Sequence, residues 1–537
     1  MDEVWLRIAA CILFSTLFCV STVKMLGAMQ QSGYKGSRFI KWLFSKDNLL
    51  FDRLWVFTVA LGMTTALMAL CFSFLGMPWA SLVSGVHFLG FCLLYLSADY
   101  RYALKVPAQK TGRFKRLFAV YFLFVASTAY ALLALLKFLS VWIDSEIYAY
   151  VAFAPFAIMY ILLPFLLYLA NGVTSVFENA RNKKFVKRAG QVLDETEMIR
   201  VGVVGSYGKT SVKNILKTIL LEKYEVVATP ESYNTPIGVA KTVFSPEFQG
   251  KKIFIAEMGA RKQGDIKELC QLVKPDFAIF TGVCEQHIAS FGSLDNVFAE
   301  KSEILKSGAF VVCGAGLKER AENAFEEEFL NEATAFVGKD RIENVQYLAT
   351  ETSFDLRLGE EIVHAKTGLL GQAAVENIAL AAVLAYESLG LSAEEIERGI
   401  AKLEPIPHRL QLIQANGVYI LDDGYNCNPI GAKEAIAAIS RFAGRKCIVT
   451  PGLVECGVLE QDINFALGEE IAKAGLDSVI LVGETLVGAV KKGYQSAGGD
   501  MEKLRMARNL KEAKPLFGDW LQKGDCVLFL NDLPDVY

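Results

Sequence analysis

The chain has 537 residues, of which 53% are hydrophobic, and its 55 basic and 58 acidic side chains leave a net charge of −3. This balance excludes a globally basic protein that binds nucleic acid, and the presence of only four histidines excludes a His-rich metal site. The mean hydropathy of +0.32 is high for a soluble protein. The excess of apolar residues lies before residue 172, where we expect a membrane domain.

Five apolar segments approach the length that crosses a bilayer, at residues 4–23, 54–75, 79–96, 117–139 and 147–170. Basic loops alternate with neutral or acidic loops between them. The positive-inside rule therefore predicts a multi-pass plasma-membrane protein with its N-terminus outside and everything after residue 172 in the cytosol. The basic loops are also candidates for attracting anionic membrane lipid, beside their simpler role as topology signals.

The eleven cysteines are scattered and form no C-x-x-C pair. This usage predicts buried free thiols in a reducing compartment rather than a disulfide framework. The start of the chain carries Asp2 and Glu3 in place of a basic region, so a cleavable signal peptide is not expected.

A polar, basic linker is expected over residues 173–198, and two α/β regions follow it. Strands alternate with helical patterns from residue 199, which predicts a P-loop-type parallel-sheet domain over 199–405 and a Rossmann-like C-terminal domain over 406–537. The membrane domain would occupy residues 1–172. The predicted strands cover residues 199–204, 224–228, 252–256, 277–281, 309–312, 418–421, 446–449, 478–481 and 526–530.

A glycine loop follows the first of these strands. It comprises Gly205, Ser206, Tyr207, Gly208, Lys209, Thr210 and Ser211. Glycines let backbone N–H groups approach a phosphate, the following helix N-terminus favours negative charge, and a Lys and a Thr offer an ammonium and a Mg²⁺ ligand. A strict Walker A motif would need glycine where Val203 stands. The short pattern alone is also compatible with a chance strand–turn–helix.

Acidic and basic side chains follow the next strands. Glu257 comes at the end of a strand, where the carboxyl edge of an open α/β sheet faces its ligand crevice, so it is placed to hold Mg²⁺ beside the phosphates. His287 follows the next strand, and Lys301 lies on the helical segment after it. Either residue alone would carry no functional signal. Their order and spacing after the glycine loop and Glu257 make them candidate site residues.

At these motifs the chain resembles the Mur ligase family, most of all its MurF branch, the UDP-N-acetylmuramoyl-tripeptide–D-alanyl-D-alanine ligases. The resemblance extends over residues 199–537. It is carried by residues 205–211, 234–239 (Asn-Thr-Pro-Ile-Gly-Val), 257–260 (Glu-Met-Gly-Ala), 287–293 together with Lys301, 422–429 (Asp-Asp-Gly-Tyr-Asn-Cys-Asn-Pro) and 449–457.

The resemblance implies an ATP-dependent amide ligase that activates a carboxylate as an acyl phosphate, which an amine then attacks. Lys209, His287 and Lys301 would carry catalysis. Thr210 and Glu257 would ligate one Mg²⁺, and His287 and Lys301 would serve a second. The family carbamylates the lysine at the position of Lys301, so the same modification is expected here.

The resemblance also assigns the remaining candidate ligands of the substrates. Asn377 matches the position that reads adenine, and Arg409 and Asp423 match positions that reach the nucleotide from the C-terminal domain. Asn234 and Thr235 match the loop that approaches the acyl substrate. Taken without the resemblance, Asn377 could instead be a helix N-cap, and Asp422 and Asp423 could cap a turn after a strand.

In this family an N-terminal domain binds the UDP-sugar. In this chain the apolar segments before residue 172 stand at that position. The expected substrate is therefore a small-molecule or lipid-linked peptide in cell-wall peptidoglycan synthesis, and other cell-wall enzymes are further candidate partners. A poly-γ-glutamate-type synthase is an alternative enzyme. A non-catalytic nucleotide-binding membrane scaffold and an ATP-hydrolysing transporter are alternatives from other classes.

Overall fold

The computed structural model describes residues 2–44, isolated positions between 56 and 93, and residues 108–139, 141–142, 154–284, 291–425, 427–454, 456, 459–483 and 485–531. The chain divides into two compact units, residues 1–183 with 534–537, and residues 184–533. The expected apolar segments at 54–75 and 79–96 lie almost wholly outside the described residues.

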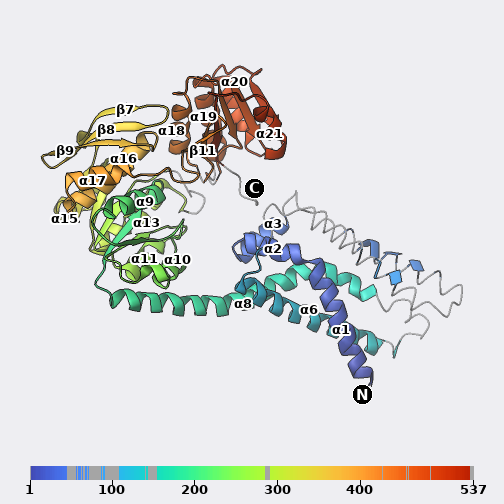
Figure 1. Cartoon of the computed structure of the whole chain (residues 1–537). Helices are drawn as coiled ribbons and strands as arrows, with labels where there is room; N and C mark the ends of the chain where they lie inside the picture. Colours follow the sequence, from blue (N-terminus) through green and yellow to red (C-terminus); the bar gives the residue numbers. More distant parts are fainter. Residues whose placement is uncertain are drawn as a thin grey trace. The chain divides into compact units, whose positions relative to one another are not determined.

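The described part of the first unit is helical (Figure 1). Two of its described helices are long and apolar enough to cross a membrane, over Gly112–Leu139 and Met159–Asp194. A third candidate is a pair of helices, Cys11–Ser21 and Val23–Gln31, bent by 50°. Its helices are α1 (Asp2–Ser21), α2 (Val23–Gln31), α3 (Gly36–Leu43), α6 (Gly112–Leu139) and α8 (Ala154–Asp194).

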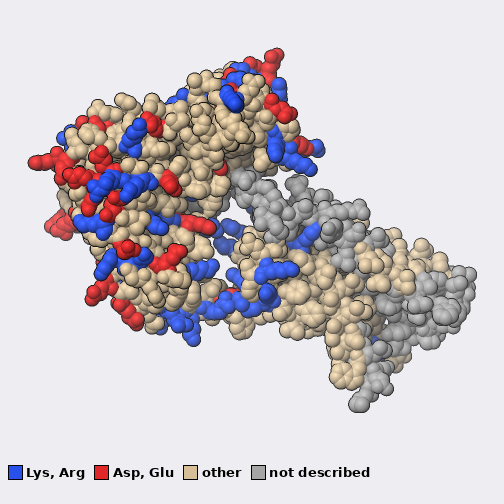
Figure 2. Space-filling view, viewed as in Figure 1, with Lys and Arg blue, Asp and Glu red and all other residues tan. Residues whose placement is uncertain are grey.

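These helices fit three of the five expected spans, and the five-span topology with its orientation stays a prediction. On the visible face of the space-filling view, the described helices of this unit are mostly free of charged side chains (Figure 2). A surface of this kind is expected where helices face lipid rather than water. Inside the unit, the hydroxyls of Thr22 and Tyr121 lie 2.9 Å apart and join the break between α1 and α2 to α6.

Helix α8 is one continuous element of 41 residues, so the expected linker over 173–198 is mostly the second half of a long helix. The division between the two units falls within it. Ala189 and Leu193, near its end, are fully buried in the hydrophobic core of the second unit. Apolar side chains at helical spacing thus fasten the end of α8 to the α/β region.

A six-stranded parallel sheet is the centre of the second unit's first half, with the strand order β2-β3-β1-β4-β5-β6. Its middle strands are buried on both faces and are rich in Val, Ile and Phe, as central parallel strands must be. Its strands are β1 (Ile199–Val204), β2 (Val226–Ala228), β3 (Ile253–Glu257), β4 (Phe277–Phe280), β5 (Phe310–Gly314) and β6 (Thr334–Val337).

Helices cover both faces of this sheet (Figure 1). One core joins the sheet to α9, α16 and α17, and a second core joins its other face to α10, α11 and the end of α8. The helices here are α9 (Lys209–Leu220), α10 (Pro236–Val243), α11 (Asp265–Val273), α13 (Leu294–Lys301), α14 (Lys318–Glu322), α15 (Glu327–Ala333), α16 (Gln372–Glu387) and α17 (Ala393–Ala401).

A small antiparallel sheet of β7 (Ile342–Tyr347), β8 (Thr352–Leu358) and β9 (Glu361–Thr367) lies beside α16 and α17. These three strands are not among the strands that the sequence pattern predicts. Buried residues alternate with more exposed ones along β8 and over most of β9, whereas β7 has no fully buried residue. Alternation of this kind indicates a sheet with one solvated face, which is weaker as a sequence signal than a continuous apolar run.

The C-terminal part contains a second six-stranded sheet, with the order β10-β11-β15-β12-β13-β14. Four of its pairings are parallel, and β10 runs antiparallel to β11 at the edge. The predicted α/β classes of both regions are confirmed. The elements are β10 (Gln411–Ala415), β11 (Val418–Asp423), β12 (Lys446–Thr450), β13 (Ser478–Val482), β14 (Leu504–Ala507), β15 (Cys526–Leu530), α18 (Pro429–Ile439), α19 (Glu460–Lys473), α20 (Val487–Ser496) and α21 (Leu510–Gly518).

Among the described cysteines, all are free thiols and only Cys71 is exposed. This is the arrangement that the spacing of the cysteines predicted for a reducing compartment.

Candidate functional site

The loop between β1 and α9 has the backbone of a phosphate cradle. Gly205 has φ +154° and Gly208 has φ +73°, conformations that a residue with a Cβ rarely adopts. Gly208 is the N-cap of α9, so the free N–H groups of that helix begin where the loop ends. A Cβ on Gly208 would lie 2.6 Å from Oδ1 of Asn377. The loop and the first turns of α16 therefore leave no room for a side chain here.

Two lysines converge on one carbonyl of this loop. Nζ of Lys209 donates to the Gly205 oxygen at 2.8 Å, and Nζ of Lys301, at the end of α13, donates to the same oxygen at 2.9 Å. Burial lowers the pKa of both ammonium groups, and the nearby Lys209 charge helps to bring the pKa of Lys301 to about 7. A lysine with this pKa spends much of its time as a neutral amine at physiological pH.

Glu257 is the centre of a polar cluster at the carboxyl end of β3. Its Oε2 accepts from the Thr210 hydroxyl at 3.0 Å and from Nζ of Lys213 at 3.2 Å, and its Oε1 accepts from the Asn234 amide at 3.1 Å. Lys213 and Glu257 are each only 1% exposed. The structure thus brings together Thr210, Glu257 and Asn234, which are far apart in the sequence.

The chemistry of these donors fits a nucleotide with its Mg²⁺. The carboxylate of Glu257 and the hydroxyl of Thr210 are hard oxygen ligands of the kind that Mg²⁺ prefers. Oγ of Ser206, inside the loop, is buried and has no hydrogen-bond partner among the described residues. A buried donor of this kind costs free energy until an acceptor such as a phosphate oxygen reaches it.

His287, the second expected ligand beside Lys301, lies outside the described residues. Within the described part of the chain, no group of three or more His, Cys, Asp or Glu side chains is arranged to hold a metal ion.

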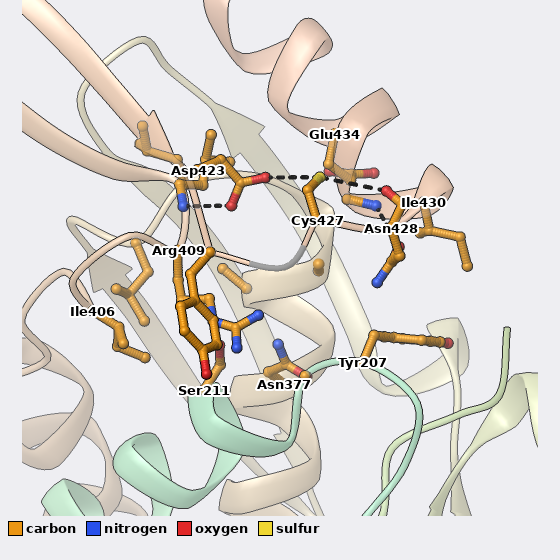
Figure 3. A pocket seen from close by; sticks show the side chains of 18 of the residues that line it. Tyr207, Ser211, Asn377, Ile406, Arg409, Asp423, Cys427, Asn428, Ile430 and Glu434 are labelled. Carbon is orange, nitrogen blue, oxygen red and sulfur yellow. Dashed lines mark hydrogen bonds between the residues drawn. The ribbon is translucent and has the colours of Figure 1, made fainter. Parts of the chain in front are cut away.

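A pocket lies between the glycine loop, the start of α16 and the first turns of the C-terminal region (Figure 3). Asn377 and Arg409 both reach into it, one from each half of the second unit. Its lining residues are Tyr207, Gly208, Ser211, Ile215, Leu369, Leu370, Ala373, Ala374, Asn377, Ile406, Arg409, Leu410, Asp423, Tyr425, Cys427, Asn428, Ile430, Gly431 and Glu434. The pocket is continuous with the phosphate cradle, since Gly208 and Ser211 belong to both.

Asp423 forms the C-terminal wall of this pocket. Its Oδ1 accepts from the Leu410 N–H at 3.0 Å, and the thiol of Cys427 donates to its Oδ2 at 3.2 Å (Figure 3). Burial raises the pKa of Asp423, and burial together with the Asp423 charge raises the pKa of Cys427 well above its usual value. The thiol therefore acts here as a hydrogen-bond donor rather than as a thiolate nucleophile.

An aromatic contact extends the pocket toward the loop after β2. The guanidinium of Arg409 lies 4.8 Å from the ring centroid of Tyr425. The hydroxyl of Tyr425 lies 3.1 Å from that of Ser232, close to the segment that contains Asn234 and Thr235. The residues expected to hold nucleotide are thus physically joined to the residues expected to approach the acyl substrate.

The structure decides between several readings that the sequence left open. Asn377 is an interior residue of α16, whose N-cap is Gly371, so the N-cap alternative is wrong. Thr235 is the N-cap of α10, because its hydroxyl accepts from the Gly238 N–H. Asp422, rather than Asp423, accepts from the N–H of Gly424 in the turn after β11.

Sequence reasoning missed two residues of this site. Lys213 lies one helical turn after Lys209 on α9, and that spacing on a helix is the signal that could have found it. Glu434, on α18, accepts from the N–H of Gln372 at the start of α16 at 2.9 Å. No local pattern marks Glu434, because its partner is distant in sequence.

Comparison with known proteins agrees with this geometry. Residues 203–385 match the Mur ligase middle domain. The UDP-N-acetylmuramoyl-tripeptide–D-alanyl-D-alanine ligase of Bacillus subtilis is 28% identical over 342 residues, covering 61% of this chain and 72% of the relative. The Escherichia coli enzyme of the same name is 30% identical over 304 residues, covering 53% of this chain and 64% of its own length.

Solved structures of MurF ligases share the fold of this chain. The MurF ligase of Thermotoga maritima, solved in complex with ADP, has a TM-score of 0.57 and 26% identity, covering 66% of this chain and 81% of that one. The MurF of Acinetobacter baumannii, at 20% identity and a TM-score of 0.58, shares the fold. Residues 203–385 are thus a Mur ligase middle domain, on which the glycine loop and the carboxylate cluster are built, and the chain is similar beyond it to the MurF branch of ATP-dependent ligases.

Proposed function

We propose that this chain is a membrane-anchored, MurF-like ligase that joins a carboxylate of a peptidoglycan precursor to an amine. ATP would first phosphorylate the carboxylate, giving an acyl phosphate and ADP. The amine would then attack the carbonyl carbon, and the amide would form as inorganic phosphate leaves and the nitrogen loses a proton. The Bacillus subtilis and Escherichia coli relatives are named as ligases that use D-alanyl-D-alanine.

The observation that carries the proposal is the placement of Lys209, Lys301 and Glu257 around one loop. Lys209 and Lys301 share the Gly205 oxygen, and Glu257 meets Thr210, which directly follows Lys209. Transfer of a phosphoryl group needs mainly positioning and neutralisation of charge. The ammonium of Lys209 and a Mg²⁺-type oxygen pair, placed beside a helix N-terminus, would supply both.

We assign the roles of individual residues as follows. The N–H groups of the loop and the ammonium of Lys209 would hold the phosphates, while Asn377, Arg409 and Asp423 would surround the base and ribose in the adjoining pocket. The ADP bound by the Thermotoga maritima relative supports this site. Thr210 and Glu257 would hold a Mg²⁺, which neutralises phosphate charge when bound.

Lys301 would act as a carbamate. The neutral amine, which the pKa of about 7 makes available, would attack the carbon of CO₂ and lose a proton. The product is an oxygen-bearing anion, which removes the repulsion between Lys301 and Lys209 and suits a second Mg²⁺ together with His287. Asn234, which donates to Glu257, would help to place the carboxylate that is activated.

The candidate spans favour an acceptor at the membrane surface. Two apolar helices, and a bent pair that makes a third candidate, precede the ligase region in the chain. A precursor held on a lipid would be confined to the same surface, which raises its effective concentration near the site. The lipid-linked form of the muramoyl peptide is therefore the preferred acceptor in this proposal.

The test is release of ADP and phosphate by the full chain in detergent or nanodiscs. Each acyl substrate is supplied in turn, as the UDP-linked tripeptide or as its lipid-linked form, with and without D-alanyl-D-alanine. Turnover that needs both substrates and disappears in Lys209→Ala is the expected result. Lys318→Ala is the matched control, because this lysine is 60% exposed on α14 and forms a surface ion pair with the exposed Glu322.

Other outcomes would favour one of the alternative functions. Turnover with glutamate alone would identify a poly-γ-glutamate-type synthase. ATP binding without turnover for any pair of substrates would contradict the ligase and favour the scaffold. Hydrolysis that needs neither substrate would favour a transporter.

A further inference from the structure

The first turn of α6 carries an unusual set of charges. The helix begins at Gly112, its opening residues include Arg113, Lys115 and Arg116, and its first turn has no acidic residue. The N-terminus of a helix already carries a partial positive charge from the aligned peptide dipoles. Basic side chains at this end repel that charge, so an anion bound there would stabilise the turn.

One carboxylate serves two of the arginines around this turn. Glu178, on α8, pairs with Nε of Arg116 at 2.5 Å and with a guanidinium nitrogen of Arg181 at 3.3 Å. Glu178 is 6% exposed, whereas the two arginines are 44% and 61% exposed. The open sides of both guanidiniums therefore remain available, and the positive charge exceeds the negative.

Arg113 adds a third guanidinium, without a carboxylate of its own. It is half-buried, lies 4.0 Å above the ring of Tyr34 and has Ser175 as a distant partner at 3.4 Å. No described carboxylate lies within ion-pair distance of it. Oη of Tyr34 is buried and has no hydrogen-bond partner among the described residues. The guanidinium thus stacks on the ring that carries this hydroxyl, and both groups are donors of the kind that bind phosphate oxygens.

The position of this cluster in the chain points to a lipid. The arginines of α6 directly precede an apolar run long enough to cross a bilayer, and Glu178 and Arg181 lie in the polar continuation of the apolar part of α8. Basic pockets between such helices, at the level of the headgroups, are typical binding sites for anionic lipid headgroups.

We propose that Arg113, Arg116 and Arg181, with the N-terminus of α6 and the Tyr34 hydroxyl, form a phosphate-binding site for a lipid headgroup that carries a phosphate or diphosphate. Glu178 orients Arg116 and Arg181 and competes with the ligand for them. The site belongs to the first unit and is independent of the ligase reaction.

The experiment measures the Kd of a polyprenyl diphosphate for the full chain in detergent micelles, by titration calorimetry. Arg181→Gln and Arg113→Gln should each raise this Kd at least tenfold. Lys183→Gln is the matched control, because Lys183 is an exposed cation on the same helix, and its Kd should stay within twofold. Phosphatidylcholine, which has no net charge, should not compete.

Glu178→Gln separates a binding site from a plain ion pair between two helices. If the cluster binds phosphate, removal of the competing carboxylate lowers the Kd, so this variant and Arg181→Gln change affinity in opposite directions. If the cluster only joins α6 to α8, both variants lower the thermal stability and neither changes the Kd by more than twofold. That second pattern, or absence of binding by the unsubstituted chain, overturns the proposal.

Inorganic pyrophosphate identifies the source of the anion. An arginine-dependent Kd for pyrophosphate within tenfold of the value for the polyprenyl diphosphate assigns the site to a soluble phosphate. A much weaker Kd for pyrophosphate assigns it to a lipid headgroup. Titration of the Lys209→Ala chain removes the contribution of the loop between β1 and α9 from both comparisons.

Discussion

Nζ of Lys213 lies 3.2 Å from Oε2 of Glu257, and both side chains are 1% exposed. Lys213 also donates to the Glu231 carbonyl, so it ties α9 both to the end of β3 and to the loop that carries Asn234. Glu257 is thereby held in a fixed orientation before any Mg²⁺ binds. Lys213 is in this sense a positioning residue for the carboxylate.

Replacement of Lys213 by Met should destabilise the second unit by about 3–5 kcal/mol, because Glu257 would be left buried without its counter-charge. Thermal unfolding of the full chain measures this effect. Lys251→Met is the matched control, since its partner Glu225 is 69% exposed, and pairs of that kind contribute roughly 0–1 kcal/mol. Equal losses in the two variants would contradict the assigned role.

A side chain at position 208 should close the nucleotide site. Gly208→Ala places a Cβ 2.6 Å from Asn377 Oδ1 in addition to its strained φ of +73°. We expect ADP affinity to fall at least a hundredfold, measured by calorimetry. Gly264→Ala is the control, since Gly264 is also a helix N-cap with positive φ but has nothing within 4 Å. It should cost about 1–2 kcal/mol of stability and leave ADP binding unchanged.

The carbamate of Lys301 should form as pH rises through about 7, because only the neutral amine reacts and burial brings the pKa to that value. An ordinary lysine, with a pKa near ~10.4, is less than about 0.1% neutral at pH 7. Carbon-13 NMR with labelled bicarbonate detects the carbamate, and Lys301→Met should lack the signal. A midpoint above about pH 9 would show that Lys301 is an ordinary lysine.

The lowered pKa of Lys301 also makes the stability of the folded chain depend on pH. Between pH 7 and ~10.4 the unfolded chain binds the proton that folded Lys301 has lost, so stability rises with pH in this window. Unfolding free energies without bicarbonate, taken as the difference between the unsubstituted chain and Lys301→Met, isolate this group. A difference that falls with pH would contradict the assignment.

Tyr425 should couple the two halves of the second unit through a single hydroxyl. Tyr425→Phe keeps the ring under Arg409 and removes only the contact with Ser232. One hydrogen bond contributes about 0.5–1.5 kcal/mol, so we expect KM for the acyl substrate to rise roughly two- to tenfold, with little change in KM for ATP. Ser232→Ala should give the same result, and the double variant should add nothing. Additive effects would show that the hydroxyls act separately.

The sequence by itself determined the local parts of this protein. Buried parallel strands are continuous apolar runs, which is why the ranges of β1 and β15 agree with their predicted bounds. The glycine loop could be identified because the phosphate cradle is built from residues adjacent in the chain, where strand, turn and helix follow directly. Glu257 could be placed at the ligand edge because it ends a strand.

Only the tertiary structure decided which distant groups meet. The sharing of the Gly205 oxygen by Lys209 and Lys301, and the burial that lowers their pKa values, arise because the end of α13 meets the loop before α9. The contact of Arg409 with Tyr425 depends likewise on how two strands and their loops fold together. Hydrophobic periodicity records that a helix or strand is buried, but not which polar side chains its burial brings face to face, because that depends on the register and order of strands far apart in the chain.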